Sequence, residues 1–243
     1  MKKYLFLVVT MLMVSVVASA QFMNAGGSSS SGFGIKSAFS GEDAPSKFNT
    51  FSFSYHPMKL ITSIDKKSSS ESMNGFSLEW NGNTKITKSV PLYFGYGLGV
   101  QYSFDKESDK VYSRDVDVAT RFLSAKIPFE LLYRFDIPST KIAIAPYVGF
   151  DAVIHLLGKK TTTTSYGGKE EVTTCNFFDE DDMLSSDATY RRFNIDWHIG
   201  AKFMFNDKWF LGAAYEGQVL KLNSYDDYSI GFGQANISVG LVF

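Results

Sequence analysis

The segment from residue 234 to residue 243 reads QANISVGLVF, and its apolar side chains fall at every second position. One face carries Ala235, Ile237, Val239, Leu241 and Phe243. The positions between them are polar or small except for the penultimate valine. Successive side chains of a strand point to opposite sides of a sheet, so this alternation predicts a strand with one apolar and one polar face.

The same period of two recurs along the whole chain after residue 48. It is clearest in residues 123–136, 142–156 and 193–205, where apolar residues alternate with polar residues or glycine. No segment shows the 3.6-residue period of an amphipathic helix. The sequence therefore predicts an all-β fold with eight strands, over residues 49–60, 72–81, 91–105, 120–136, 140–157, 191–206, 208–221 and 233–243.

The size of the side chains on the apolar face indicates which face of these strands lies inside. Aromatic residues make up 16% of the chain, and nearly half of the apolar face consists of rings. An eight-stranded barrel has an interior only just wide enough for side chains, so these rings would overfill it. The polar face is rich in small residues, among them Gly95, Gly97, Gly99, Gly149, Gly200 and Gly212. This distribution predicts an eight-stranded antiparallel up-and-down transmembrane β-barrel in the outer membrane, with the apolar face against lipid.

Charged residues of the polar face predict a closed, charge-filled lumen. Buried charges are costly unless they are paired. Here the polar face carries both cations and anions, so its charges can pair inside the lumen. The cations are Lys126, Arg134, Lys141 and Lys202, and the anions are Glu79, Glu130, Asp151, Asp196 and Glu216. The interpretation is a structural or adhesive protein that acts through its extracellular loops, and a small-solute pore is an alternative.

The start of the chain predicts export. Two lysines precede an apolar run over residues 4–17, which ends in the small residues 18–20. This is the pattern of a secretory signal peptide, so we expect residues 1–20 to be a signal peptide, residues 21–45 a flexible segment and residues 46–243 the barrel. The net charge of −1 argues against nucleic acid as a partner, and the single cysteine, Cys175, excludes an internal disulfide.

In these features the chain resembles the small outer-membrane β-barrels of Gram-negative bacteria, of the OmpA and OmpX type. The final alternating strand ending in Phe243 is the most specific point of resemblance. In that family, a terminal aromatic residue is similar to the signal that the outer-membrane assembly machinery reads, which implies this machinery as a partner. Pro128 and Pro146 depart from the pattern, because each removes a ladder donor within a predicted strand, and we expect bulges there.

The longest connection, residues 158–190, contains a predicted hairpin. Threonine-rich runs flank Gly167 and Gly168, which suit a tight turn. The hairpin has no apolar face, so it is expected to stand above the membrane, like the protruding sheet of OmpX-type proteins. We hypothesise that its edge pairs with a strand of a surface protein partner, and the alternative is an inert loop.

Two groups of residues could carry chemistry. Residues 179–182 read DEDD, but their spacing does not match a calcium-binding EF-hand loop, so no metal site is predicted. His155 with Asp151 and His198 with Asp196 share inward faces, and a histidine–carboxylate pair can activate a serine. An outer-membrane lipid-modifying enzyme of lipase or acyltransferase type is therefore an alternative. With no nucleophile motif and no histidine on the lipid face, the prediction is no enzyme, catalytic residue or cofactor.

Overall fold

The computed structural model describes residues 44–64, 67–112, 114–179, 190–225 and 228–243. The predicted signal peptide, and all but the last two residues of the predicted N-terminal segment, lie outside the described residues. Among the described residues, no helix is long and apolar enough to cross a membrane.

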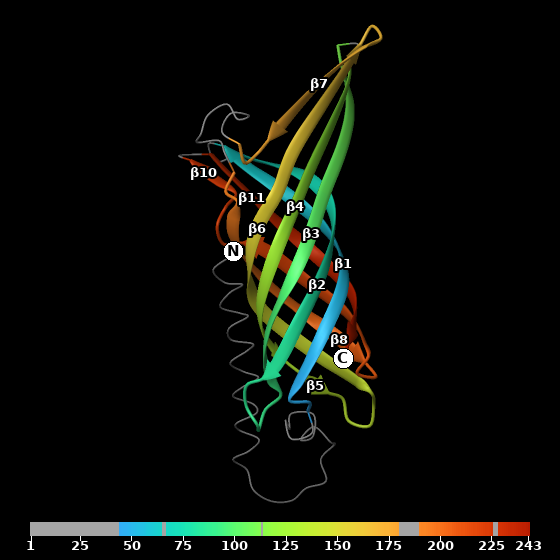
Figure 1. The fold of residues 1–243 in the computed structure, drawn as a ribbon, viewed down its shortest axis with the longest axis vertical. Coiled ribbons are helices and arrows are strands. Elements are labelled where there is room, and N and C mark those ends of the chain that lie inside the picture. Colours follow the sequence, from blue (N-terminus) through green and yellow to red (C-terminus); the bar gives the residue numbers. More distant parts are fainter. Residues whose placement is uncertain (1–43, 65–66, 113, 180–189, 226–227) are drawn as a thin grey trace, which may run out of the picture.

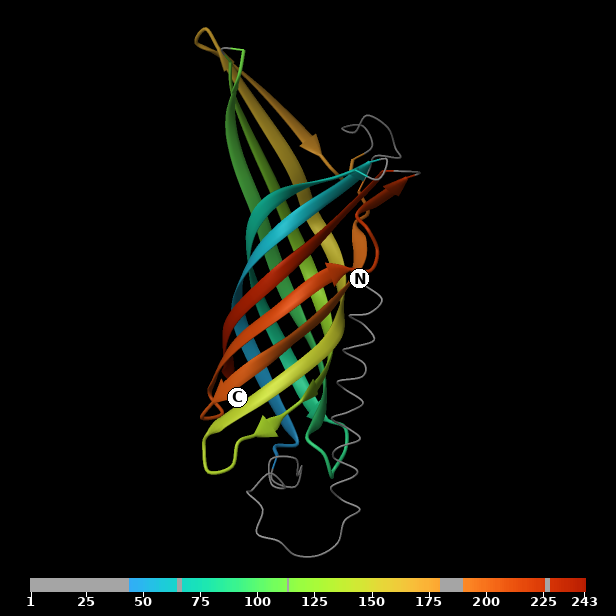
Figure 2. The same cartoon turned by 180° about the vertical axis from the view of Figure 1, so that it is seen from behind.

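Eight long strands form a closed ring, as the sequence predicts (Figures 1 and 2). Each strand pairs antiparallel with the next, and the first closes the ring on the last, from Thr50 opposite Val242 to Ile64 opposite Tyr228. In chain order the ring consists of β1 (Lys47–Ile64), β2 (Lys67–Lys85), β3 (Leu92–Val111), β4 (Arg114–Tyr133), β6 (Ile142–Tyr166), β8 (Phe193–Phe205), β9 (Trp209–Gln218) and β11 (Tyr228–Val242).

Three short strands extend this ring at its ends. β5 (Phe135–Asp136) and β7 (Lys169–Asn176) pair with β6, and β10 (Asn223–Tyr225) pairs with β11. β5 and the C-terminus lie at the end with short turns, and β7 lies at the opposite end (Figure 1). We call these the short-turn end and the long-strand end.

The two faces of the strands are assigned as predicted. Apolar side chains of the outer face are exposed, with Leu98 and Ile237 each 63% exposed, while the serines, glycines and charges of the polar face are buried inside. An outer surface of this kind suits lipid and not water. One residue of the predicted outer face differs, because Tyr133 is only 6% exposed at the short-turn end.

Several strands continue beyond their predicted limits. Residues 106–119 were expected to be mostly loop, yet β3 and β4 pair up to Val111 opposite Arg114. Above the lipid a strand needs backbone partners but no apolar face, so its sequence loses the period of two without losing the structure. The extensions form a sheet that rises past the other strands (Figure 1), made of residues 105–111 of β3, 114–122 of β4, 158–166 of β6, and β7. We call it the protruding sheet.

The predicted hairpin is present at the tip of the protruding sheet. β6 pairs with β7 from Lys159 opposite Asn176 to Tyr166 opposite Lys169. Between them, Gly167 and Gly168 have φ of 57° and 78°, a backbone region that glycine adopts without steric cost.

The predicted bulges at Pro128 and Pro146 are wrong. Both prolines keep the register of their strands, and β4 shifts register against β6 between Leu123 and Ser124 instead. Pro128 falls in an interruption of the β3–β4 ladder, and Pro146 lies beyond the last pair between β4 and β6. The missing donors therefore fall where the ladders already lack bonds, and no bulge is required.

Candidate functional site

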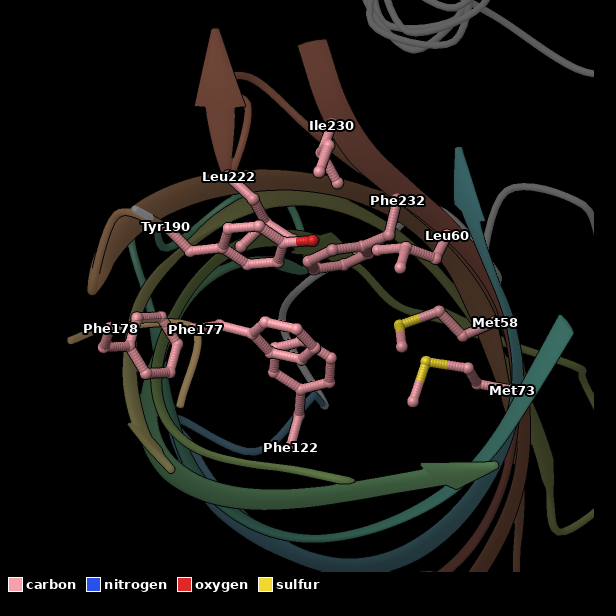
Figure 3. Packing of buried hydrophobic residues seen from close by; sticks show 10 residues of the cluster. All are labelled: Met58, Leu60, Met73, Phe122, Phe177, Phe178, Tyr190, Leu222, Ile230 and Phe232. Carbon is pink, nitrogen blue, oxygen red and sulfur yellow. The ribbon is translucent and has the colours of Figure 1, made fainter. Parts of the chain in front are cut away.

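The lumen is filled in three layers. A lower cluster of apolar side chains seals the short-turn end, and it consists of Phe48, Tyr93, Leu132, Ala143, Ala145, Tyr147, Met204, Phe210 and Val242. An upper cluster occupies the long-strand end (Figure 3), and it consists of Met58, Leu60, Met73, Phe122, Phe177, Phe178, Tyr190, Leu222, Ile230 and Phe232. Charged and polar residues fill the space between the two clusters.

Two buried lysines hold the charged layer together. Nζ of Lys126 lies 2.8 Å from Oε2 of Glu216 and 3.1 Å from Oδ2 of Asp151. Nζ of Lys202 donates a hydrogen bond of 2.8 Å to Oε2 of Glu130. These links join β4, β6, β8 and β9 across the lumen, so the ring is braced from within as well as by its ladders.

The histidine pairs expected from the sequence are not formed. Nδ1 of His198 lies 3.1 Å from Oδ2 of Asp151, which is on the neighbouring strand, and not beside Asp196 on its own strand. Gly149 lies directly opposite His198, so Asp151 is a diagonal cross-strand neighbour of His198. Diagonal neighbours and residues two positions apart on one strand are separated by a similar distance of about 7 Å, so sequence proximity alone could not identify the carboxylate that His198 contacts.

The lumen contains fewer cations for its five carboxylates than the sequence predicts. Lys141 was expected to point inward but lies exposed in the turn between β5 and β6. Arg134 is buried at the short-turn end, where it is bound to Asp136 at 2.7 Å and to Asp207 at 2.6 Å. Two lysines are left to face five inward carboxylates, and of the three buried histidines His198 is the one with an acidic partner among the described residues. The carboxylates are Glu79, Glu130, Asp151, Asp196 and Glu216.

A serine, a histidine and an asparagine form a chain just below the upper cluster. Oγ of Ser124 lies 2.8 Å from Nδ1 of His155, and the Asn194 amide lies 2.9 Å from Nε2 of the same ring. With the amide nitrogen directed at the carbonyls of Phe193 and Leu220, the amide oxygen accepts from Nε2. The sequence did not indicate this chain, because its members lie on three different strands and their contact depends on the register.

Ser124 and His155 also line a small cavity between the charged layer and the upper cluster. Its apolar wall includes Met58, Leu60 and Phe122, and its polar wall includes Ser124, His155 and Asp196. Over the described ranges, no group of three or more His, Cys, Asp or Glu side chains is arranged to hold a metal ion. Of the acidic run at 179–182, only Asp179 falls within the described residues.

The protruding sheet presents two lateral edges. One is residues 105–111 of β3, since the ladder between β2 and β3 ends at Asn74 opposite Phe104. The other is β7, which pairs only with β6 among the described strands. Tyr112, 95% exposed, and Tyr166, 60% exposed, stand at the two tips of the sheet. Cys175 of β7 is half-buried and packs against the upper cluster.

Comparison with known proteins assigns the chain to a class. Residues 5–243 match the family model of the outer membrane protein beta-barrel domain, so the chain belongs to this family of outer-membrane proteins. By the rule for such barrels, its short-turn end faces the periplasm and the protruding sheet faces outward. No curated protein sequence matches the chain.

Several solved structures are similar to the chain at low sequence identity. The chain is similar to Ail, the attachment invasion locus protein of Yersinia pestis, with 14% identity over 82% of this chain and 100% of Ail, and a TM-score of 0.37. For Neisserial surface protein A the identity is 18% over 79% and 96% of the two chains, with a TM-score of 0.33. For the outer membrane enzyme PagL the identity is 14%, the match covers 75% of this chain and 97% of PagL, and the TM-score is 0.33.

Proposed function

We propose that this protein is a closed outer-membrane barrel that binds a partner protein at the cell surface through its protruding sheet. The observation that carries the proposal is the outer edge of residues 169–174 of β7, which pairs with no strand other than β6 among the described strands and projects away from the membrane. An extended segment of a partner can add to such an edge through main-chain hydrogen bonds. The filling of the lumen favours this role over a pore, because buried apolar clusters occupy both ends and ion pairs join the strands between them.

The sequences of the two edges favour β7 as the binding edge. The β3 edge carries alternating acids and lysines, such as Asp105, Lys106 and Asp109, and charged edges resist strand addition. β7 has charges only near its turn, and Val172, Thr173 and Thr174 follow without any. These three residues are exposed, so a partner strand has access to them.

The tips of the protruding sheet offer side chains that suit a protein partner. Tyr112 has φ of 48°, a conformation that costs a non-glycine residue energy, and its ring is almost fully exposed. Tyr166 packs under the guanidinium of Arg114, whose carbon lies 5.5 Å from the ring centre. Tyrosine and arginine are enriched among the residues that dominate binding energy in protein interfaces.

Shortening the hairpin tests the proposal. Removing residues 161–166 and 169–174 leaves the Gly167–Gly168 turn between Lys160 and Cys175, which are register partners, so the shorter hairpin can still close. Adherence of cells that display this variant, to cultured host cells and to other cells of the same bacterium, is expected to fall about tenfold relative to the full-length chain. Binding is counted by microscopy at equal surface density of the two proteins.

Lysine substitutions on the two edges separate their contributions to binding. Val172→Lys with Thr174→Lys adds charge to the β7 edge and is expected to reduce adherence, whereas Ser108→Lys on the already charged β3 edge is expected to leave it unchanged. Heat-modifiable gel mobility verifies that all variants remain folded. Adherence that is insensitive to the hairpin and to both β7 lysines would contradict strand addition.

Catalysis is the second candidate, and the Ser124–His155–Asn194 chain is the observation in its favour. A serine bonded to a histidine that a third residue orients is the general arrangement of an activated nucleophile. However, Ser124 and His155 are each only 4% exposed and face the lumen, while acyl chains of membrane lipids contact the outer face. The geometry therefore supports a buried hydrogen-bond network, and we propose that the chain is not a lipid-modifying enzyme.

The Ser124→Ala variant tests this assignment. We expect cells that produce it to show the same acyl composition of lipid A and phospholipids as cells with the natural chain, because no lipid reaches Ser124 from the outer face. Mass spectrometry of extracted lipids measures the composition, with a strain lacking the protein as the reference. An acyl change that needs Ser124 would establish the enzyme instead.

A further inference from the structure

The outer face of the barrel changes from apolar to charged at one level of β4. The outward residues from Leu123 to Leu131 are all apolar, over a length that matches the about 9–11 residues with which a tilted strand crosses the hydrocarbon core. The next outward residue toward the long-strand end is Arg121, which lies between the buried Thr120 and Phe122. Arg121 therefore stands at the level where the lipid headgroups of the outer leaflet begin.

The first charges at this level have one sign. On each of four strands, the first charged outward residue above the apolar outer residues is a cation, namely Lys59 of β1, Lys106 of β3, Arg121 of β4 and Lys159 of β6. At the short-turn end, by contrast, the partly exposed acid Asp136 and the exposed acid Asp207 accompany Arg134. The outer headgroup level is thus selectively positive, and clustered cations at a membrane surface attract anionic lipids.

Two of these cations are direct cross-strand neighbours. β4 and β6 run side by side (Figure 1), and Arg121 lies opposite Lys159 in their ladder. Both residues are exposed, and both are flanked by a buried inward residue, Phe122 in β4 and Gly158 in β6, so they share the outer face. Facing side chains of neighbouring strands are about 5 Å apart, and like charges placed there repel each other. An anion bound between the two cations would remove this repulsion.

The acids of the protruding sheet do not neutralise this pair. Lys106 of the same level has the carboxylate of Asp117 at 3.4 Å, on the side away from lipid. Within the described part of the chain, neither Arg121 nor Lys159 forms an ion pair with an acid. The other cross-strand neighbour of Arg121 is an aromatic residue, Phe104. The pair is therefore open to an anion from outside the chain.

The chemistry of the pair and of its surroundings selects a lipid phosphate. A guanidinium offers two parallel N–H donors to a phosphate group, and an ammonium adds a compact charge. A phosphate monoester carries a charge of about −1.5 to −2 at pH 7, so one group can neutralise both cations. Directly on the lipid side of the pair lie the apolar side chains of Leu123 and Leu156. A ligand that meets both features joins a phosphate to acyl chains.

We propose that Arg121 and Lys159 together bind one phosphate group of a phosphorylated outer-leaflet lipid of the lipid A class, with its acyl chains against Leu123 and Leu156. The site differs from the partner edge at residues 169–174 of β7 both in its residues and in its ligand. It does not depend on binding of a partner protein, and it would fix the height at which the barrel sits in the outer leaflet.

Native mass spectrometry of the purified full-length barrel in detergent, titrated with lipid A, tests the site. Saturable binding of lipid A is expected, and the same lipid without its phosphates should bind at least about tenfold more weakly. Arg121→Gln combined with Lys159→Gln should also weaken lipid A binding at least about tenfold, because both charge-assisted contacts are lost. The exchanged pair, Arg121→Lys with Lys159→Arg, keeps one guanidinium and one ammonium and should bind within about threefold of the natural chain.

Lys88→Gln with Lys141→Gln is the matched control, because it removes two positive charges from exposed positions at the short-turn end. Its affinity for lipid A should equal that of the natural chain. Equal binding of dephosphorylated lipid, or unchanged affinity of the double glutamine variant at 121 and 159, would overturn the proposal. Inorganic phosphate that binds as tightly as lipid A would overturn it too, since the acyl chains would then contribute nothing. Heat-modifiable mobility confirms that each variant is folded.

Discussion

The Lys126→Met variant is expected to lose about 3–5 kcal/mol of unfolding free energy, the usual cost of removing one partner from a buried ion pair. Lys126 is 4% exposed and contacts both Glu216 and Asp151. Without its ammonium, two carboxylates would stay buried next to each other, in a layer that has only two lysines for five inward carboxylates. The loss of unfolding free energy therefore comes mainly from leaving the carboxylates of Glu216 and Asp151 buried without a positive partner. The lost attraction between the charges contributes less.

Lys141→Met is the matched control, because it makes the same chemical change at an exposed turn. Its unfolding free energy should stay within about 0.5 kcal/mol of the natural value. Guanidinium unfolding of both variants in lipid vesicles, followed by tryptophan fluorescence, gives the two numbers. If Asp151→Asn and Glu216→Gln are added to Lys126→Met, we expect part of the stability to return, because the buried charges are then neutral. Equal stabilities of Lys126→Met and Lys141→Met would refute the role of the buried lysine.

The alternation of side chains was sufficient to predict the ring and its two faces. A one-residue slip would turn every ring of an outer strand into the lumen, so the pattern fixes the face strongly. The same rule explains where prediction stopped. Above the lipid neither face must be apolar, so the extensions of β3, β4 and β6 gave no periodic signal.

Contacts inside the lumen could not be predicted in the same way. Which inward residues meet depends on the register between strands, and the chain of Ser124, His155 and Asn194 spans β4, β6 and β8. Lys141 shows a second limit, because a turn residue next to a strand can match the alternation without belonging to the sheet. That Lys126, Asp151 and Glu216 point into the lumen was predictable from the alternation, but the partner of each side chain was not.

The Gly97→Ala variant is expected to lose about 3 kcal/mol of unfolding free energy, at the upper end of the usual cost of overpacking. Gly97 of β3 lies opposite Asn81 of β2 and faces inward. A Cβ at this position would overlap the carbonyl oxygen of Trp80 and Oδ1 of Asn81. The amide could turn away, but the carbonyl belongs to the neighbouring backbone, so relief requires the strands to separate.

Gly99→Ala, two positions along the same face, separates this steric cause from a general intolerance of the strand. A Cβ there would lie 3.4 Å from Cγ of Glu79 and 3.4 Å from the carbonyl oxygen of Leu78, which is tight but can be relieved by a small shift. Its unfolding free energy should change by less than about 1 kcal/mol, since alanine also restricts the unfolded chain. Both variants are refolded into vesicles and their unfolding compared. A Gly99→Ala loss as large as that of Gly97→Ala would show that the strand needs glycine for a reason other than the approach of the Trp80 backbone, because the two sites share their strand, face and chemical change and differ in that contact.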